Sequence, residues 1–330
     1  MITLAVDCMG SDNGPKVLQE GIINFLKEHD DCKIVACGRK EELDKLVDLP
    51  NVEIIDARDV LAMDVGPLEA ARSRESSLYK AVNYMKEFNA DGVISAGSTG
   101  GFLSVATIKL KLIEGIQRAA LISPFPTKTG SPTIILDIGA SNETTADQLV
   151  QFAHMGSIYS HNIFKVENPK IYLLSNGVEE EKGTPEIKEA HQKLKLENSI
   201  NFKGNVEARD ALDGHCDVIV TGGFAGNIFL KSSEGMAKMM SGMIKKAFYT
   251  NLLTKIGYLF SKKGFKEMKK SMDYETYGGA MLLGVNGVVV KAHGSATAFS
   301  FKCALDVAYR MAKSNVVETI KKEVNNSDRT

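Results

Sequence analysis

Six short apolar runs in this chain each end in a turn of glycine and small polar residues, and this repeated pattern limits the fold more than any other feature. The turns lie at residues 7–12, 95–101, 137–142, 175–177, 221–227 and 291–295. The carboxyl ends of strands in an open parallel sheet lie along one edge, where ligands bind. Backbone N–H groups and short polar side chains at such an edge favour an anion, and phosphate is the one we expect.

Short β-branched runs alternate with helical patterns, which predicts a layered α/β fold with right-handed crossovers. We expect strands at residues 2–6, 33–36, 52–55, 92–95, 119–123, 133–138, 170–174, 217–221 and 288–291. These runs are continuously apolar rather than alternating, as in strands buried in a parallel sheet. Helices are predicted at residues 41–47, 76–88, 145–160 and 185–196. Because no linker or internal repeat interrupts the pattern, residues 1–330 are interpreted as one domain.

The composition excludes several classes of protein. With 44% hydrophobic and 25% charged residues, the composition is that of an ordinary globular protein. The net charge of −1 gives no overall positive electrostatic potential that would attract nucleic acid. No basic n-region followed by an apolar h-region opens the chain, so we expect no signal peptide. No apolar run reaches the roughly 18 residues of a membrane span. The expected location is therefore cytoplasmic.

Neither a metal nor a catalytic thiol is predicted. The five cysteines are scattered, and Cys32 and Cys37 lack the second pair of ligands that zinc needs. Cys8 lies in the first turn, but no histidine beside it supports a nucleophile. Asp7, Asp12 and Asp137 fall in separate turns, so we expect them to accept backbone N–H bonds and hold the loops in shape rather than to ligate a metal.

Residues 232–272 contain no strand pattern but two consecutive helical patterns. The first is rich in Met, and we expect its apolar face to pack on a two-fold mate in a homodimer. The second carries apolar residues at helical spacing among lysines, namely Leu252, Leu253, Ile256, Leu259 and Phe260, with Lys262 and Lys263. A basic amphipathic helix suits the surface of an anionic membrane. A second dimer contact is the alternative that remains open.

Phosphate chemistry is favoured over nucleotide chemistry. The turns match neither the dinucleotide fingerprint nor the P-loop, so nicotinamide and nucleoside-triphosphate enzymes are disfavoured and no cofactor is expected. Cations lie near several turns instead: Arg118, Lys182, Lys291 and His293. Such groups would neutralise a phosphate or phosphoryl group.

The turns, taken in order, resemble those of the bacterial phosphate acyltransferase (PlsX) family. The matching motifs include Asp7-x-Met9-Gly10-x-Asp12, Ser95-Ala96-Gly97-x-Thr99-Gly100, Leu136-Asp137-x-Gly139-Ala140, Lys182-Gly183, Gly223-Phe224-x-Gly226-Asn227 and Lys291-Ala292-His293-Gly294. The resemblance implies a three-layer α/β fold with a mostly parallel sheet, similar to isopropylmalate dehydrogenases and phosphotransacetylases, with a protruding helical hairpin at 232–272. It also implies a homodimer that associates peripherally with the membrane. The implied reaction converts acyl-acyl-carrier protein and inorganic phosphate to acyl-phosphate for phosphatidic acid synthesis.

This resemblance leads to a specific hypothesis for the site. Phosphate would bind the backbone amides of residues 97–101 and 139–142, with Lys182, Lys291 and His293 as cationic partners and Asn227 in the oxyanion hole. The residues expected around the substrates are Asp7, Gly10, Asp12, Gly97, Ser98, Thr99, Gly100, Arg118, Asp137, Gly139 and Asn142.

Several positions depart from the family pattern, among them Ser98, Ser141, Gly222 and Ala225, where the family usually has Asn, Asn, Asp and Thr. We therefore expect backbone amides and cationic side chains, rather than these four side chains, to bind the substrates. A phosphotransacetylase-like enzyme that uses acyl-coenzyme A, and a catalytically weak membrane-bound scaffold, remain the alternatives.

Overall fold

The computed structural model describes residues 1–271 and 277–327, with the backbone only at residues 252, 266–271 and 325–327. Within these residues the strands form one sheet in the order β3-β2-β1-β4-β11-β10-β5-β6-β9-β7-β8. The strands are β1 Ile2–Asp7, β2 Cys32–Gly38, β3 Val52–Asp56, β4 Gly92–Ser95, β5 Ala120–Phe125, β6 Thr133–Leu136, β7 Lys170–Ser175, β8 Asn201–Glu207, β9 Val218–Val220, β10 Ala280–Leu283 and β11 Val288–Lys291.

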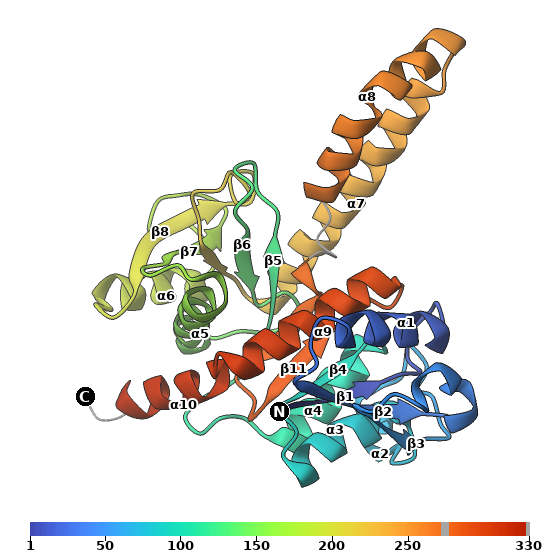
Figure 1. Ribbon diagram of the computed structural model, residues 1–330. Helices are drawn as coiled ribbons and strands as arrows, with labels where there is room; N and C mark the ends of the chain where they lie inside the picture. The colour runs from blue at the N-terminus through green and yellow to red at the C-terminus, as the bar shows by residue number, and fades with distance from the viewer. Residues whose placement is uncertain (272–276, 328–330) are drawn as a thin grey trace.

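Helices cover both faces of the sheet (Figure 1). The helices are α1 Pro15–Leu26, α2 Pro67–Arg72, α3 Ser77–Phe88, α4 Thr99–Leu110, α5 Ala146–Phe164, α6 Pro185–Leu196, α7 Gly223–Phe248, α8 Leu252–Ser271, α9 Ala298–Lys313 and α10 Val316–Ser327. One apolar core joins the sheet to α1, α5, α6, α9 and α10, and the other joins it to α2, α3 and α4. Along β1, Leu4 and Val6 enter the first core and Ala5 enters the second, as the pleat requires. The predicted three-layer α/β fold is confirmed.

The sheet is not parallel throughout, and this corrects the expectation that all six turns share one edge. Strand β10 is antiparallel to both β11 and β5, and β5 is antiparallel to β6. Strands β6, β9, β7 and β8 therefore run opposite to β1, β4 and β11. The turns after β1, β4 and β11 form one group, and the turns after β6, β7 and β9 form another.

Most predicted elements are confirmed within a few residues, and the misses have physical causes. The expected helix at 41–47 is instead a pair of 3₁₀ turns, Lys40–Glu42 and Asp44–Leu46, in a segment too short to propagate an α-helix. Strand β8 was missed because Lys203, Gly204 and Asn205 interrupt its apolar pattern. Strand β10 was missed because the segment Ala280–Leu283 follows two glycines and is short.

The predicted helical protrusion is present as α7 and α8, which project together from the α/β body (Figure 1). Helix α7 begins at Gly223, nine residues before the predicted start of the protrusion, so its first turns belong to the body. No helix among the described residues is both long and apolar enough to cross a membrane.

The start of α7 is fastened to the turn after β6 by close backbone packing. A Cβ atom at Gly226 would lie 1.9 Å from the carbonyl oxygen of Asp137, and one at Gly223 would lie 2.5 Å from the Asp137 carboxylate. Only glycine allows this approach. The direction of α7 is therefore set by the turn that follows β6.

This packing predicts opposite effects for the same substitution at two places in α7. Gly226→Ala should lower the free energy of unfolding by about 1–3 kcal/mol, because the methyl group overpacks against Asp137. Gly235→Ala is the matched control: nothing lies within 4 Å of its would-be Cβ, so the helix should gain about 0.5–1 kcal/mol. Urea unfolding of both variants measures the difference. Equal effects of the two substitutions would contradict the proposed fastening.

Candidate functional site

Asp7 joins the turns that follow β1 and β4. Its carboxylate accepts hydrogen bonds from the Met9 N–H (3.2 Å), the Ser77 hydroxyl (2.6 Å) and the Ser95 hydroxyl (2.7 Å). The side chain is 1% exposed. As the sequence predicted, this carboxylate holds loops in shape.

The turns after β1, β4 and β11 pack into one unit, which we call the Asp7 cluster (residues 7–13, 95–101 and 291–297). Gly10 lies against Gly97, where a Cβ at Gly10 would come within 2.6 Å of the Gly97 Cα. The Asp12 N–H donates to the carbonyl of Gly294 at 2.9 Å. Helices α1, α4 and α9 start directly after these turns, so their positive dipole ends meet at this cluster.

The start of α4 exposes backbone donors at the Asp7 cluster. The Gly97 N–H is used by the Ser95 hydroxyl (2.9 Å), and the Ser98 hydroxyl caps the helix by accepting the Gly101 N–H (3.3 Å). Thr99 and Gly100 are exposed in the first turn, where N–H groups have no intrahelical acceptor. An anion can bind here through these free donors.

Lys291 places a buried ammonium group at the Asp7 cluster. The residue is 7% exposed, and its Nζ donates to the carbonyl of Ala292. Burial lowers the pKa of this lysine to about 8, while Asp7 and Asp12 act in the opposite direction and Lys231 lowers the pKa further. A buried cation beside helix N-termini is a strong anion partner, and this one titrates close to neutral pH.

His293 lies exposed two residues after Lys291, within the same cluster. The Ser295 N–H donates to its Nδ1 at 3.2 Å, and the Ser295 hydroxyl lies 2.8 Å from the same atom. Since Nδ1 accepts a backbone N–H, the neutral ring carries its proton on Nε2. The structure thus brings Lys291 and His293 together, as predicted.

Asp137 organises a second unit, the Asp137 cluster (residues 137–145 and 221–227). The carboxylate is fully buried and accepts the N–H groups of Leu121, Gly139, Ala140 and Ser141 at 2.8–3.0 Å, together with the Ser141 hydroxyl at 2.7 Å. The amides of residues 139–141 are therefore already used. The hypothesis that these amides bind phosphate is corrected: only the Asn142 amide remains from that set.

Helix α7 connects the two clusters. Asn227 lies over Gly139, whose φ of +136° is one that glycine tolerates, and a Cβ there would come within 2.4 Å of the Asn227 Nδ2. Phe224, Asn227 and Lys231 follow the i, i+3, i+7 spacing of one helix face. Because Lys231 influences the pKa of Lys291, this face leads from the Asp137 cluster toward the Asp7 cluster.

A cavity of about 1490 Å³ lies beside the Asp137 cluster, bounded by the first turns of α5, α6 and α7. Two predicted residues, Arg118 and Asn142, line it. Its charged lining consists of Arg118, Arg209, Glu143, Glu186, Glu189 and Glu207. With more carboxylates than guanidinium groups, this cavity disfavours a free phosphate. A neutral, partly polar ligand fits it better.

Lys182 does not join Lys291 and His293. It lies in the loop after β7, packed against Gly177, and β7 is five positions from β11 in the sheet. At about 4.8 Å per strand this amounts to roughly 24 Å. The expectation that these three cations contact one phosphate is therefore not supported.

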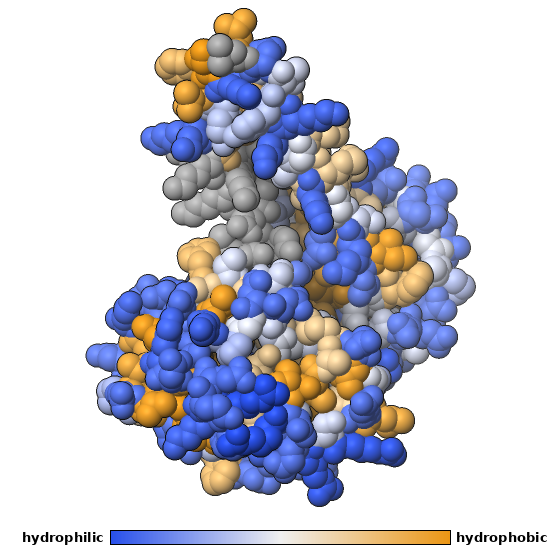
Figure 2. All heavy atoms as spheres, turned by 90° about the vertical axis from the view of Figure 1, so that its right-hand side faces the viewer, coloured by the Kyte–Doolittle hydropathy of each residue, from blue (hydrophilic) through white to orange (hydrophobic). Residues whose placement is uncertain are grey.

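The structure also bears on Cys8 and on the exposed residues of the hairpin. Burial raises the pKa of the Cys8 thiol well above its usual value, which excludes a nucleophilic thiolate. On the hairpin, Leu253, Ile256, Leu259 and Phe260 are exposed, as are Lys262 and Lys263. The side chain of Leu252 lies outside the described residues. Figure 2 shows hydrophobic side chains gathered at the far end of the protrusion, with hydrophilic ones beside them.

Two relevant residues were missed by sequence reasoning. Lys231 could have been found from its i, i+4 spacing after Asn227. Ser175 could not: its hydroxyl is buried beside the cavity and has no hydrogen-bond partner within the part of the chain that the structure describes.

Comparison with known proteins decides the family. A family model described as "Fatty acid synthesis protein" matches residues 2–319. Curated relatives named "Phosphate acyltransferase" include one from Clostridium botulinum, 43% identical over 97% of this chain and 98% of its own, and one from Campylobacter lari, 40% identical over 99% of both. The chain belongs to the phosphate acyltransferase (PlsX) family. It is thus an enzyme that transfers an acyl group to phosphate.

Solved structures support the fold. A phosphotransacetylase from Streptococcus pyogenes aligns with a TM-score of 0.60 at 15% identity, covering 96% of this chain and 94% of its own. A branched-chain phosphotransacylase from Enterococcus faecalis aligns with a TM-score of 0.55, also at 15% identity, covering 94% and 99%. The expected phosphotransacetylase-like architecture is confirmed.

The buried position of Lys291 predicts how activity depends on pH. If the ammonium form neutralises phosphate, turnover at low phosphate should fall as the pH rises through about 8, because the charge is lost there. Lys291→Arg keeps the charge, so this fall should move to higher pH. The rate of acyl-phosphate formation between pH 6 and 10 measures both. A rate that increases through pH 8 would instead assign Lys291 a neutral, proton-accepting role.

Proposed function

We propose that this enzyme converts fatty acyl-acyl-carrier protein and inorganic phosphate to acyl-phosphate and free carrier protein, as a step toward phosphatidic acid. The observation that carries the proposal is the buried Lys291 ammonium at the meeting point of three helix N-termini, in a chain of this family. That arrangement is suited to holding an inorganic anion.

Phosphate would bind at the Asp7 cluster. The first-turn amides of Thr99 and Gly100 would donate to its oxygens, as would the Nε2–H of His293, while the Lys291 ammonium would neutralise its charge. Asp12 lies exposed nearby and would orient the loop. The carboxylate of Asp7 is occupied by its own hydrogen bonds and acts only through the loops it holds.

In the reaction, an oxygen of HPO₄²⁻ attacks the thioester carbonyl and a C–O bond forms. The carbonyl electron pair moves onto the oxygen, and the resulting oxyanion would accept a hydrogen bond from the Asn227 amide. Collapse of this intermediate breaks the C–S bond, and the phosphate proton ends on the leaving thiol. Since phosphate is itself the nucleophile, the protein needs only to position it and stabilise charge.

The acyl thioester would approach along α7. The cavity beside the Asp137 cluster has the size for a long, uncharged arm, with apolar walls from Leu149, Leu174 and Ile187. The face of α7 that carries Phe224, Asn227 and Lys231 would guide the thioester from this cavity to the phosphate. A carrier protein is acidic, so lysines on the hairpin such as Lys262 and Lys263 would serve for docking.

The hairpin at 232–272 would mediate contact with a second copy and with the membrane. The exposed methionines of α7, Met236, Met239, Met240 and Met243, form an apolar face suited to a homodimer. Leu253, Leu259 and Phe260 of α8 are exposed among lysines, as expected for peripheral binding to an anionic membrane surface.

The choice of donor is tested by offering the enzyme long-chain acyl-carrier protein, acyl-coenzyme A and acyl-pantetheine with phosphate, and following release of free thiol. We expect the carrier-bound donor to have the highest kcat/KM, and its KM to increase with salt. Equal kcat/KM for acyl-coenzyme A would favour the phosphotransacetylase-like alternative.

The membrane role predicts that a variant with Leu253→Ser, Leu259→Ser and Phe260→Ser loses binding to anionic vesicles. The removed apolar area supplies the binding free energy, so the partition coefficient should fall at least tenfold. Co-sedimentation with phosphatidylglycerol vesicles measures it. Turnover with a soluble acyl donor should stay unchanged and acts as the control for folding. Unaltered vesicle binding would contradict the membrane role.

A further inference from the structure

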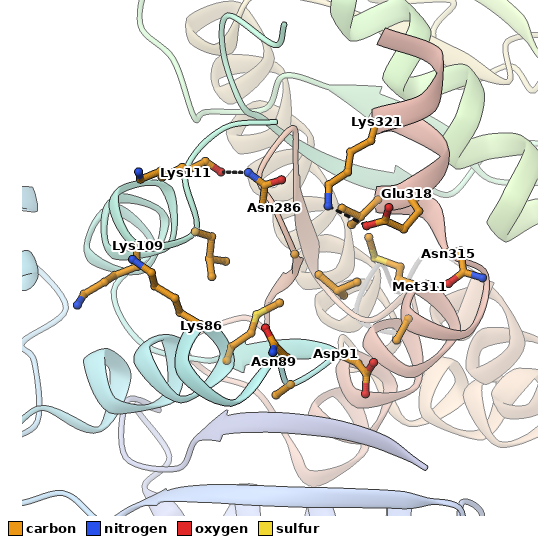
Figure 3. Close-up of a pocket in the computed structure, with 17 residues that line it drawn as sticks. Lys86, Asn89, Asp91, Lys109, Lys111, Asn286, Met311, Asn315, Glu318 and Lys321 are labelled. Carbon is orange, nitrogen blue, oxygen red and sulfur yellow. Dashed lines mark hydrogen bonds and ion pairs between the residues drawn. The ribbon is translucent and has the colours of Figure 1, made fainter. Parts of the chain in front are cut away.

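A second pocket lies far from the Asp7 cluster, at the amino ends of β4 and β11 (Figure 3). Those two strands pair in register from Val288 and Gly92 at the pocket to Lys291 and Ser95 at the Asp7 cluster. The pocket is bounded by the carboxyl ends of α3 and α4 and by the corner between α9 and α10. Its volume of about 510 Å³ is in the range of small-molecule sites.

Most charged side chains of this pocket, which we call the lysine pocket, are lysines. Lys86, Lys109, Lys111 and Lys321 line it, against the carboxylates of Asp91 and Glu318. Both carboxylates are already engaged: Asp91 accepts the Thr3 N–H at 2.7 Å, and Glu318 pairs with Lys321 at 2.7 Å. With four lysines against two carboxylates, the lining keeps a net charge of +2.

Lys86, Lys109 and Lys111 have no carboxylate partner within the part of the chain that the structure describes. Among the described residues Lys86 and Lys111 form no ion pair, whereas surface lysines such as Lys33 and Lys193 do. Lys109 donates to the Asn83 side chain at 2.9 Å and lies over the Tyr79 ring. Lysines near helix carboxyl ends are favourable in themselves, so their position alone does not indicate a ligand.

Lys111 also has a strained backbone conformation. Its φ of 61° and ψ of 162° fall in a region that glycine occupies almost exclusively. The conformation is held by the Asn286 N–H, which donates to the Lys111 carbonyl at 3.0 Å, and by the Asn286 side chain, which donates to the Lys111 and Leu112 carbonyls. Glycine would be free of strain here. Replacing Lys111 by glycine would therefore remove its ammonium group and relieve the backbone strain at the same time.

The floor of the lysine pocket is apolar. Met85, Leu110, Val288 and Met311 are each less than a tenth exposed and line it. A ligand that fits has an anionic head for the lysines and an apolar body for this floor. Because the lining carries a net charge of +2, a doubly charged phosphate head matches it better than a singly charged carboxylate.

We propose that the lysine pocket binds a phosphomonoester with an apolar chain, at a site separate from the one where acyl transfer occurs. The proposal does not depend on the assignment of the acyl donor or of the phosphate-binding residues. It depends on the lysines and on the apolar floor of this pocket.

Octyl phosphate is a suitable probe, and the two methionines of the floor report on it locally. In protein labelled with ¹³C at the methionine methyl groups, the Met85 and Met311 signals are assigned from Met85→Leu and Met311→Leu. We expect octyl phosphate to shift both signals in a saturable way, with octanoate and octan-1-ol binding more weakly in that order. Equal affinity for octan-1-ol, or no shift of these signals, would overturn the proposal.

Lys111→Gly separates binding from folding, because it removes the ammonium and relieves the backbone. The dissociation constant should increase about fivefold while the thermal unfolding midpoint stays level or rises. Lys165→Gly is the matched control, since Lys165 also has a positive φ (60°) but lies at the end of α5, outside the pocket. It should leave the affinity unchanged. If the two variants bound octyl phosphate equally well, the anion would not be held by the lysine pocket.

Discussion

The buried carboxylate of Asp137 is the interaction on which the arrangement of the site depends. By accepting the N–H groups of Gly139, Ala140 and Ser141 it fixes the turn after β6 in one shape. The first turn of α7 then packs on this turn through Gly223 and Gly226. A buried carboxylate with unsatisfied oxygens would be very costly, so the loop and the helix start are stabilised together. Asp137 thereby directs α7 toward Lys291.

Charge divides the site into two parts with different chemistry. The Asp7 cluster combines helix N-termini with Lys291 and His293, and it suits an inorganic anion. The cavity beside the Asp137 cluster has more carboxylates than guanidinium groups and would repel a free phosphate. Under the proposed function, this division would keep the charged nucleophile apart from the acyl donor before they react.

Much of the fold could be predicted from sequence, because buried strands and their glycine turns leave strong local patterns. The structural roles of Asp7 and Asp137 followed from their separate turns, and the grouping of Lys291 with His293 followed from their adjacency. The reversal of strand direction was not predicted, because it comes from the antiparallel pairing of β5 with β6, which the apolar patterns of these two strands do not reveal. Strand β10 is antiparallel to both β11 and β5, so β5 again runs parallel to β11. The β5–β6 pair moves residues 139–142 away from residues 97–101, and the strand order separates Lys182 from Lys291.

The most direct test of the two-part site is the KM for phosphate in variants of the cations. Lys291→Ala and His293→Ala should raise this KM at least tenfold, whereas Lys182→Ala should leave it within twofold of the wild type. Any effect of Lys182→Ala should appear in the KM for the acyl donor, which Lys291→Ala and His293→Ala should leave unchanged. A KM for phosphate that rises equally in Lys182→Ala and Lys291→Ala would contradict the separation of the two clusters.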